Sequence, residues 1–526
     1  MRSAAEYSES MKGSAWSAKS AWSAIARSPY RFGPPDPQRQ SHRHCRPRTV
    51  TYGDPMGPRY LLTDSPLSSL QAYCDIGGGE AFEVALKTGP DSVIREVIAA
   101  GLRGRGGAGF PTGEKWRSIA AGGDDVGSRY VVANGAEGEP GTFKDRAIIR
   151  HNPYQLIEGI IIAAFAVGAK DAFVAIKASS SVEYERLAQA VAEVELAGWL
   201  EQVSLKLVRG PEEYLFGEEK ALLEVIEGED PLPRHAPPYL YGLFSATPQL
   251  GWSVGPALRG RGRAPASSNP TLVNNVETLA NVAPIVRLGA EWYRSMGTPE
   301  SPGHAVVTVS GATNRAGVAE VEFGRPLREV LDEIGGGMPD GSTIKAVLSG
   351  VANPVITRNR LGAPMSYEGL SAVGGGLGAA GFMVFDDQTD MVSVAYGVSR
   401  FLYIESCGQC PACKFGCGEI TSYLGRILEG RATPHDLEVI TARLQTVTDA
   451  NRCGLAGQER EVISSILRAF PEDVADRLTG NGSPGPPPSI GKIVDIKDGV
   501  VVLDDKQQYK RPDWSYDDSP VIISRA

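Results

Sequence analysis

The stretch GLRGRGGAGFPTGEKW, residues 101–116, carries six glycines and three basic side chains around one Phe-Pro pair. Gly104, Gly106 and Gly109 match the G-x-G-x-x-G fingerprint of dinucleotide-binding proteins, which requires a strand before it and a helix after it. The preceding residues, VIREVIAAGL, have helical periodicity, and Phe110-Pro111 interrupts the chain directly after the fingerprint. The loop therefore predicts an α/β protein that binds its ligand without a Rossmann fold.

The composition of this loop suits an anionic ligand with an aromatic ring. Consecutive glycines let backbone N–H groups approach an anion closely, and Arg103, Arg105 and Lys115 supply positive charge. Phe110 offers a ring on which a flat heterocycle can stack. Flavin mononucleotide and a nicotinamide nucleotide fit this description equally well. A glycine-rich turn without a ligand is the alternative interpretation.

The segments after the loop alternate between strand and helix patterns. A strand is expected at 130–134, a helix opened by Asn-Pro at 152–169, a strand at 171–177 and a helix at 181–199. This alternation is typical of an α/β layer.

Two acidic loops are candidates to complete a pocket. Asn134, Glu137 and Glu139 come just after the first strand, where α/β proteins bind ligands. Glu218 and Glu219 stand at the start of a predicted helix. Their carboxylates suit hydrogen bonds from ribose hydroxyls or an amide, and the alternative is that they are solvated acids or helix-terminus charges.

The second half of the chain predicts two smaller units and an extension. Two strands, a turn and a helix at 304–337, with a strand at 343–350, indicate a β-grasp-like module. A helical pattern covers 389–478 and carries most of the cysteines. A Pro- and Gly-rich linker at 479–489 precedes GKIVDIKDGVVVLDD, which predicts a terminal β-hairpin.

The segment ESCGQCPACKFGCGEI holds four of the seven cysteines. Cys407, Cys410 and Cys413 follow C-x2-C-x2-C spacing, which suits an iron–sulfur cubane better than the paired hooks of a zinc site. Cys453 is expected as the fourth ligand, closing the site from a separate helix turn, ahead of Cys417. A zinc site and structural thiols in a helical core are the alternatives.

Composition narrows the class of protein. With 42% hydrophobic and 22% charged residues the chain is an ordinary globular one, and its net charge of -9 argues against a general nucleic-acid binder. The longest apolar stretch, 159–169, is too short to cross a bilayer. Residues 1–57 are expected to be a disordered tail, or to precede a true start at Met56, rather than to be a targeting presequence.

Several motifs, taken in order, carry a resemblance to a known family. GLRGRGGAGFPTGEKW, EPGTFKDR, GEEKALLEVIEG, LVNNVETLANV and ESCGQCPAC…C resemble the NADH-oxidising, FMN-bearing subunit of respiratory complex I and the diaphorase subunits of NAD-linked hydrogenases and formate dehydrogenases. The resemblance implies a non-Rossmann α/β flavin domain at 58–300, a β-grasp (ubiquitin-like) module at 301–388 and a helical bundle with one [4Fe–4S] cluster at 389–478. Residues 479–526 would be a linker and hairpin extension.

The resemblance also implies roles for individual residues. No catalytic acid or base is expected, because the cofactors carry the chemistry of hydride transfer. The residues that would face NADH are Phe110, Glu139 and Glu219. The cluster ligands would be Cys407, Cys410, Cys413 and Cys453. The residues that would line the FMN are Gly104, Arg105, Gly106, Gly107, Lys115, Asn134, Tyr214, Gly217, Glu218, Val273, Asn274, Asn275 and Thr278.

The implied function is that of an NADH dehydrogenase subunit that takes a hydride from NADH onto FMN and passes single electrons through the [4Fe–4S] cluster to partner subunits. A [2Fe–2S] thioredoxin-like subunit is the usual companion in the family. The expected localisation is cytoplasmic, or peripheral on the inner face of a membrane complex.

Two alternative functions arise from departures from the family pattern. Ala136 stands where the family has an acid, Ser118 where it has an aromatic residue and Ala236 where it has a lysine. These positions leave open an electron-transfer subunit whose donor is not NADH, or a non-catalytic assembly subunit.

Overall fold

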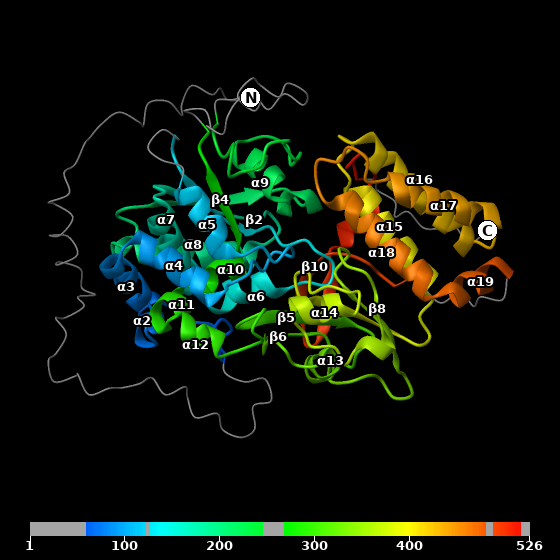
Figure 1. Cartoon of the computed structure of the whole chain (residues 1–526), viewed down its shortest axis with the longest axis horizontal. Helices are drawn as coiled ribbons and strands as arrows, with labels where there is room; N and C mark the ends of the chain where they lie inside the picture. Colours follow the sequence, from blue (N-terminus) through cyan, green and yellow to red (C-terminus); the bar gives the residue numbers. More distant parts are fainter. Residues whose placement is uncertain (1–58, 122–126, 246–267, 480–487, 517–526) are drawn as a thin grey trace.

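The structure is a computed structural model that describes residues 59–121, 127–245, 268–479 and 488–516. The predictions for residues 1–57 and for most of the 479–489 linker therefore lie outside the described residues. Figure 1 shows an α/β part, a second sheet beside it and a group of helices that carries the later part of the chain.

A four-stranded parallel sheet organises the α/β part. Its strand order is β3-β2-β1-β4, and the two strands expected from the sequence, at 130–134 and 171–177, are confirmed as its two central strands. The strands are β1 (Tyr130–Gly135), β2 (Asp171–Lys177), β3 (Ser204–Gly210) and β4 (Thr271–Asn275).

The two faces of this sheet are buried by different helices. Val131 and Ala133 of β1 face the larger core, which the apolar helix α7 (Pro153–Val167) fills. Val132 faces a smaller core with Phe216 and Leu222 from the short 3₁₀ turn η2 (Tyr214–Gly217) and helix α9 (Glu219–Ile226). Burial of both faces is the usual state of a parallel sheet.

Further helices complete the α/β part. Asn152 caps α7 by accepting from the Gln155 amide, as the Asn-Pro start predicts. The helices are α2 (Leu70–Asp75), α3 (Glu80–Thr88), α4 (Pro90–Ala100), α5 (Thr112–Ala120), α6 (Lys144–His151), α8 (Ser181–Leu196), α10 (Val276–Ala280), α11 (Val282–Leu288) and α12 (Ala290–Arg294).

The glycine loop joins two helices. Helix α4 ends at Ala100 and is capped by Gly101, whose φ of 71° lies in the left-handed region, and α5 begins at Thr112, directly after Phe110-Pro111. The strand that a Rossmann fold needs before the fingerprint is absent between the described residues 59 and 101, so the prediction of a non-Rossmann loop is confirmed.

A five-stranded mixed sheet lies beside the α/β part. Its order is β6-β5-β9-β7-β8, with β5 and β9 parallel and the other neighbours antiparallel. Its strands are β5 (His304–Gly311), β6 (Gly317–Glu322), β7 (Ile344–Ser349), β8 (Ile356–Thr357) and β9 (Gly381–Asp386). Helices α13 (Leu327–Gly335) and α14 (Tyr367–Ala372) contribute to its core.

The region expected to be helical at 389–478 is helical. Within the described residues, no helix is long and apolar enough to span a membrane. The helices share one core that includes Cys410, Cys413 and Cys417. They are α15 (Met391–Glu405), α16 (Pro411–Leu428), α17 (Pro434–Thr446), α18 (Leu455–Ala469) and α19 (Pro471–Thr479).

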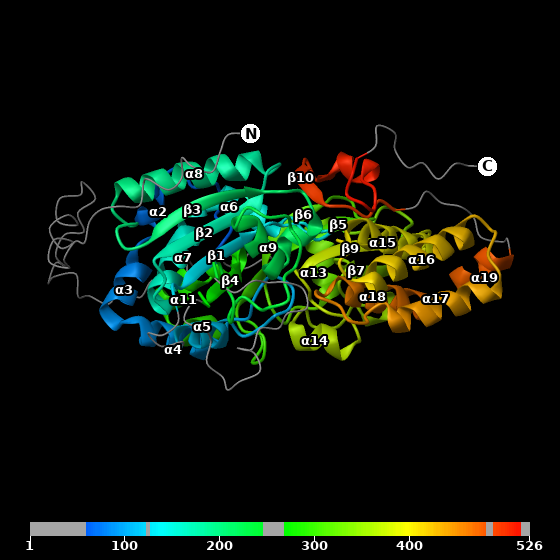
Figure 2. The same ribbon diagram turned by 90° about the horizontal axis from the view of Figure 1, so that it is seen from above.

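The last described segment, residues 488–516, forms the expected hairpin and a 3₁₀ turn. Strands β10 (Ile493–Lys497) and β11 (Val500–Leu503) pair antiparallel and lead into η5 (Asp505–Tyr509). Lys497 pairs with Val500, so Asp498 and Gly499 form the turn, and both have the positive φ that a two-residue hairpin turn requires. Figure 2 shows the segment lying over the junction between the α/β part and the helices.

Candidate functional site

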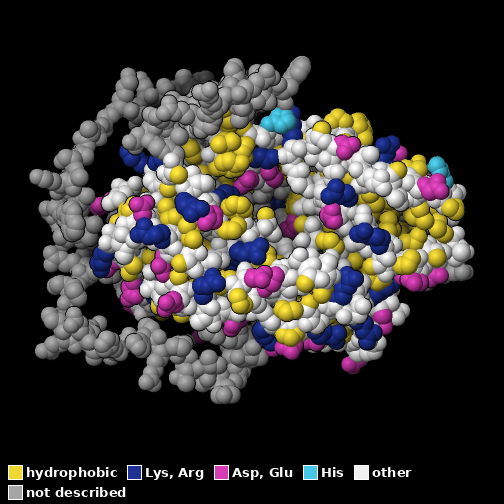
Figure 3. All heavy atoms as spheres, in the orientation of Figure 1, with side chains coloured by type: hydrophobic (Ala, Val, Ile, Leu, Met, Phe, Trp, Pro, Cys, Tyr) yellow, Lys and Arg dark blue, Asp and Glu magenta, His cyan; other side chains and the backbone are white. Residues whose placement is uncertain are grey.

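A cavity of about 420 Å³ opens where the three parts of the molecule meet. Its wall includes the carboxyl ends of β1 and β4, loops of the mixed sheet at Asn353 and Gly378, and the start of α18. Figure 3 shows the surface hollowed between the α/β part and the helices. A parallel sheet binds ligands at the carboxyl ends of its strands, and the volume lies within the usual range for small-molecule pockets.

The structure brings eight of the predicted nucleotide-site residues to this cavity. They are Gly106, Gly107, Asn134, Glu139, Tyr214, Gly217, Glu218 and Asn275.

The glycine loop presents bare backbone to the cavity. Gly107 has a φ of 120°, and no atom lies within 4 Å of the point where a Cβ would stand. Gly104 donates its amide to the Phe110 carbonyl at 2.8 Å, which closes the loop on itself. A glycine-lined wall of this kind lets a phosphate or a ring approach the main chain closely.

The arginines of the loop anchor it rather than face the cavity. The buried Arg105 guanidinium donates to the Tyr293 hydroxyl and to the His304 carbonyl, both at 2.9 Å. Arg103 stacks on the Tyr367 ring, 3.9 Å from its centroid. These contacts tie the loop to α12 and to the mixed sheet, so the positive charge counted from the sequence stabilises the loop.

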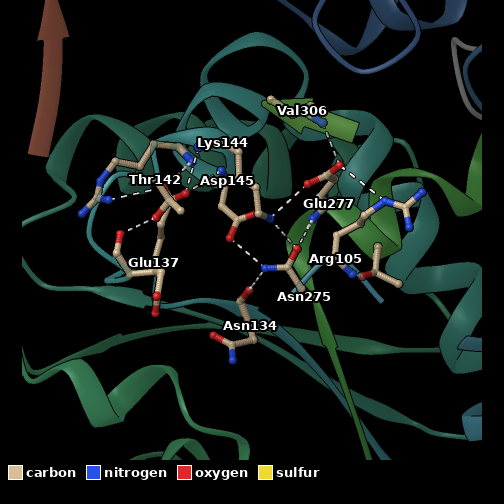
Figure 4. A network of polar contacts seen from close by, with 12 residues as sticks. Arg105, Asn134, Glu137, Thr142, Lys144, Asp145, Asn275, Glu277 and Val306 are labelled. Atoms are coloured by element: carbon tan, nitrogen blue, oxygen red, sulfur yellow. Dashed lines mark hydrogen bonds and ion pairs between the residues drawn. The ribbon is translucent and has the colours of Figure 1, made fainter. Parts of the chain in front are cut away.

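A buried polar network forms the wall behind the glycine loop (Figure 4). The Lys144 ammonium donates to Asp145 at 2.7 Å and to Asn275 at 2.9 Å, and it lies 3.1 Å from Glu277. Burial alone would lower the pKa of Lys144, but the three neighbouring carboxylates Asp145, Glu277 and Glu137 raise it well above its ordinary value. Lys144 is therefore a fixed cation on the cavity wall.

The acidic loop with Glu137 and Glu139 is held in place by hydrogen bonds to its two carboxylates. The Glu137 carboxylate accepts from the backbone amides of Lys144, Asp145 and Arg146, the first turn of α6. Glu139 accepts from the Tyr214 hydroxyl and, at 2.6 Å, from the Val351 amide. Burial raises the pKa of Glu139 despite these two donors.

Glu218 serves as the N-cap of α9, as the helix-terminus alternative anticipated. Its carboxylate accepts from the Lys220 amide at 2.9 Å and from the Ala221 amide at 3.0 Å, while the side chain also borders the cavity. Asn134 donates to the Gly217 carbonyl at 2.8 Å, which joins the end of β1 to this turn.

The other predicted residues lie around the cavity rather than in its wall. Lys115 and Glu219 pair with each other at 2.8 Å, and Phe110 is 58% exposed. Asn274 and Thr278 support the site from behind by accepting from the Trp116 indole and the Arg105 amide, both at 2.8 Å. The members of this group are Gly104, Arg105, Phe110, Lys115, Glu219, Val273, Asn274 and Thr278.

The four predicted cluster ligands line one small cavity. Cys407, Cys410 and Cys413 face it from the loop and start of α16, and Cys453 faces it from the turn before α18. Cys417 lies one helical turn beyond Cys413, fully buried among the helices, and does not line this cavity. This placement favours Cys453 over Cys417.

The surroundings of these thiols suit an iron–sulfur cluster. Burial raises the pKa of Cys453 to about 12, so a thiolate there needs a cation beside it. Gln409 donates to the Cys407 sulfur at 3.6 Å, a contact of the kind that tunes such clusters. Among the described residues, no group of three or more His, Cys, Asp or Glu side chains is arranged so that it could hold a metal ion.

The two cavities share part of their walls. Leu215, Cys453 and Leu455 line both the nucleotide-sized cavity and the cysteine cavity. A ligand in the first cavity would therefore lie against a wall that includes one of the four cysteines.

Sequence reasoning missed several residues of the larger cavity. Lys144 and Asp145 lie in the F-K-D-R motif quoted above. These two opposite charges directly after the acidic loop are a signal from which their place in the cavity could have been predicted. Asn353 and Gln458 come from distant elements and carry no local signal.

Comparison with known proteins gives matches along most of the chain. Residues 97–284 match the family model described as the Nuo51 FMN-binding domain, and residues 393–477 match the NADH-ubiquinone oxidoreductase-F iron-sulfur binding region.

Individual relatives agree with these models. The chain is 37% identical to the second of the F subunits of NADH-quinone oxidoreductase from Rhizobium meliloti, over 77% of this chain and 94% of that protein. It is 36% identical to the F subunit of the same enzyme from Aquifex aeolicus, over 77% and 90%. Among solved structures it resembles a chain of the NAD+-reducing [NiFe]-hydrogenase in the H2-reduced state, with a TM-score of 0.66, 33% identity, and coverage of 80% of this chain and 68% of that one.

Proposed function

The chain belongs to the family of NADH-quinone oxidoreductase F subunits, and from this premise we propose that its central cavity brings NADH to FMN and that its cysteine cavity carries the electrons away. The chain is an NADH oxidoreductase subunit of this family, with an FMN-binding domain and a 4Fe–4S region. The observation that carries the proposal is the wall of Leu215, Cys453 and Leu455 shared by the two cavities.

Each cavity has the residues to hold its cofactor. We assign the FMN phosphate to the bare backbone at Gly106 and Gly107, with Lys144 as a buried cation in the same wall. The four cysteines 407, 410, 413 and 453 would bind the cluster. When bound, FMN accepts a hydride from NADH, and the cluster carries the electrons onward one at a time.

The protein's own contribution is orientation and charge. The Glu139 carboxylate, held by Tyr214 and Val351, would position the nucleotide beside the flavin ring. The Lys115–Glu219 pair and the exposed Phe110 stand at the outer edge, where they would contact the nucleotide as it enters. None of these groups needs to exchange a proton, so no catalytic acid or base is required.

We infer the domain boundaries from the same arrangement of parts. Residues 58–300 would be the flavin domain, 301–388 a β-grasp module and 389–478 a helical domain for the cluster. The β-grasp assignment is supported by the parallel pair β5–β9 at the centre of an otherwise antiparallel sheet. Membership of the family implies a multi-subunit complex, and we propose a [2Fe–2S] thioredoxin-like subunit and further electron-accepting subunits as partners.

The test is reconstitution with the cofactors, followed by measurement of the bound flavin and iron and of NADH oxidation. Protein loaded anaerobically with FMN, iron and sulfide should retain one flavin and about four irons per chain and should oxidise NADH with ferricyanide as acceptor. Cys453→Ser should lose the iron, because this thiol lines the cluster cavity. A chain that binds neither cofactor would refute the proposal, whereas one that binds both without oxidising NADH would favour a different donor.

A further inference from the structure

The C-terminal segment 488–516 lies past the region that either family model matches, yet it is built into the molecule. Ile493 joins the core of the α/β part, and Asp495 pairs with Arg150 of that part at 2.8 Å. The Gly499 carbonyl accepts from the Ala316 amide of the mixed sheet at 2.6 Å. The segment thus contacts both the α/β part and the mixed sheet.

The same segment makes its most buried contacts at Glu405, the last residue of α15. The Lys510 ammonium donates to the Glu405 carboxylate at 2.7 Å, Gln507 donates to it at 3.0 Å and Lys492 lies 3.4 Å away. Glu405 and Lys510 are fully buried. A buried carboxylate is costly unless cations and donors surround it, and all these side-chain partners come from the C-terminal segment.

Glu405 connects the segment to both cavities. Its carboxylate also accepts from the Tyr214 amide at 3.0 Å, and Tyr214 lines the flavin cavity. The next two residues in the chain, Ser406 and Cys407, line the cysteine cavity. One carboxylate therefore holds the backbone of a residue of one cavity and lies two residues before the first cysteine of the other.

Further contacts hold the cysteine loop, residues 406–410 between α15 and α16, from the side of the C-terminal segment. The Trp514 indole donates to the Ile404 carbonyl at 2.9 Å. Lys414, which lies between Cys413 and Cys417 in α16, donates to the Ser406 carbonyl at 2.7 Å and to the Pro512 carbonyl. The end of α15 and the start of α16 are therefore both tied to residues 512–514.

We propose that residues 488–516 act as a clamp that sets the position of the cysteine loop relative to Tyr214, with Lys510 as a positioning residue acting through Glu405. The inference rests on the proposed function, because it concerns the two cofactors assigned there. It adds a segment outside the matched family regions to the set of residues that determine the properties of the cluster and the flavin.

The test compares variants of the full, reconstituted chain in an EPR-monitored redox titration, with FMN affinity measured by fluorescence. Lys510→Met should shift the cluster midpoint potential downward, because a buried positive charge beside the loop is lost, and should weaken FMN binding severalfold. Lys510→Arg should restore both values. Lys506→Met, which removes an exposed lysine of the same segment, should match the full chain.

A second variant separates charge from folding. Glu405→Gln combined with Lys510→Met removes both charges together, so the potential should return towards that of the full chain, and this variant remains informative if Lys510→Met alone fails to fold. A Lys510→Met protein with unchanged potential, EPR line shape and FMN affinity would overturn the clamp. Failure of the unmodified chain to bind either cofactor would instead refute the proposed function.

Discussion

At the scale of single residues, the wall of the cavity proposed for FMN includes a balanced set of buried charges. Lys144, Asp145 and Glu277 have almost no exposed surface, and each has its partners within the network. Removing one partner of such a set leaves an uncompensated buried charge, which is far more costly than the loss of a surface pair.

Lys144→Met should therefore destabilise the protein by about 3–5 kcal/mol, since Asp145 and Glu277 would lose their shared cation. Urea unfolding monitored by tryptophan fluorescence measures this loss. Lys87→Met, which removes a lysine whose side chain is 73% exposed, is the matched control and should leave the unfolding midpoint unchanged. Equal midpoints for both variants would show that the network is not a stabilising unit.

The two candidate fourth ligands can be told apart by paired serine variants. Cys453→Ser should lose most cluster iron, because Cys453 lines the cysteine cavity, while FMN binding persists, because serine is close in size to cysteine and keeps the wall that the two cavities share. Cys417→Ser should keep the iron, because Cys417 is buried among the helices and away from that cavity. Iron content and the visible spectrum after reconstitution decide the matter, and the opposite pattern would assign the ligand to Cys417.

At the scale of elements, the glycine loop shows how far local sequence signals reach. The sequence pattern alone indicates the helix before residue 101 and the break at Phe110-Pro111, so the non-Rossmann character of the loop could be predicted. The direction of Arg105 could not, because it depends on Tyr293 and His304, which lie 188 and 199 residues away in sequence. Basic residues beside a glycine loop thus indicate that positive charge is present, but not whether their side chains point into the cavity.

Gly107→Ala should weaken FMN binding by about tenfold or more, because the added methyl would enter the cavity from a backbone with a φ of 120°. Gly430→Ala is the control, since Gly430 also has a positive φ and free space around it but belongs to a distant turn. Fluorescence titration with FMN measures both. If the two variants bind FMN equally well, the cavity wall is assigned wrongly.

At the scale of the whole molecule, the sequence predicted each part better than the way the parts join. The strands at 130–134, 171–177 and 343–350 and the terminal hairpin are local patterns, and the structure confirms them. Strand β9, helix α6 and the shared cavity wall were missed, because they depend on packing between elements far apart in the chain. The cysteine spacing was informative because ligand geometry restricts it strongly.

A long-range contact near the start of the described chain gives a pH-dependent prediction. The buried Glu320 carboxylate accepts from the amides of Tyr60, Leu61 and Leu62 and lies 2.9 Å from His304. Burial alone would raise the pKa of Glu320, but His304 and the backbone donors lower it below its ordinary value. The resulting stability is present above the ordinary pKa of about 4.3 and is lost as the pH falls through the lowered value.

Glu320→Gln should therefore cost about 2–3 kcal/mol at pH 7, and its difference from the unmodified chain should narrow below about pH 4. Unfolding curves across an acid pH series measure this. A difference that widens toward acid pH would contradict the assigned direction of the pKa.

The central claim is that NADH reduces a flavin bound in the cavity of this chain. The direct measurement is an anaerobic titration of the FMN- and cluster-loaded protein with NADH, tracking the visible absorbance of the flavin. We expect stoichiometric bleaching. A flavin that stays oxidised under NADH but bleaches with dithionite would contradict the claim and would indicate that Ala136, Ser118 and Ala236 mark an altered nucleotide site.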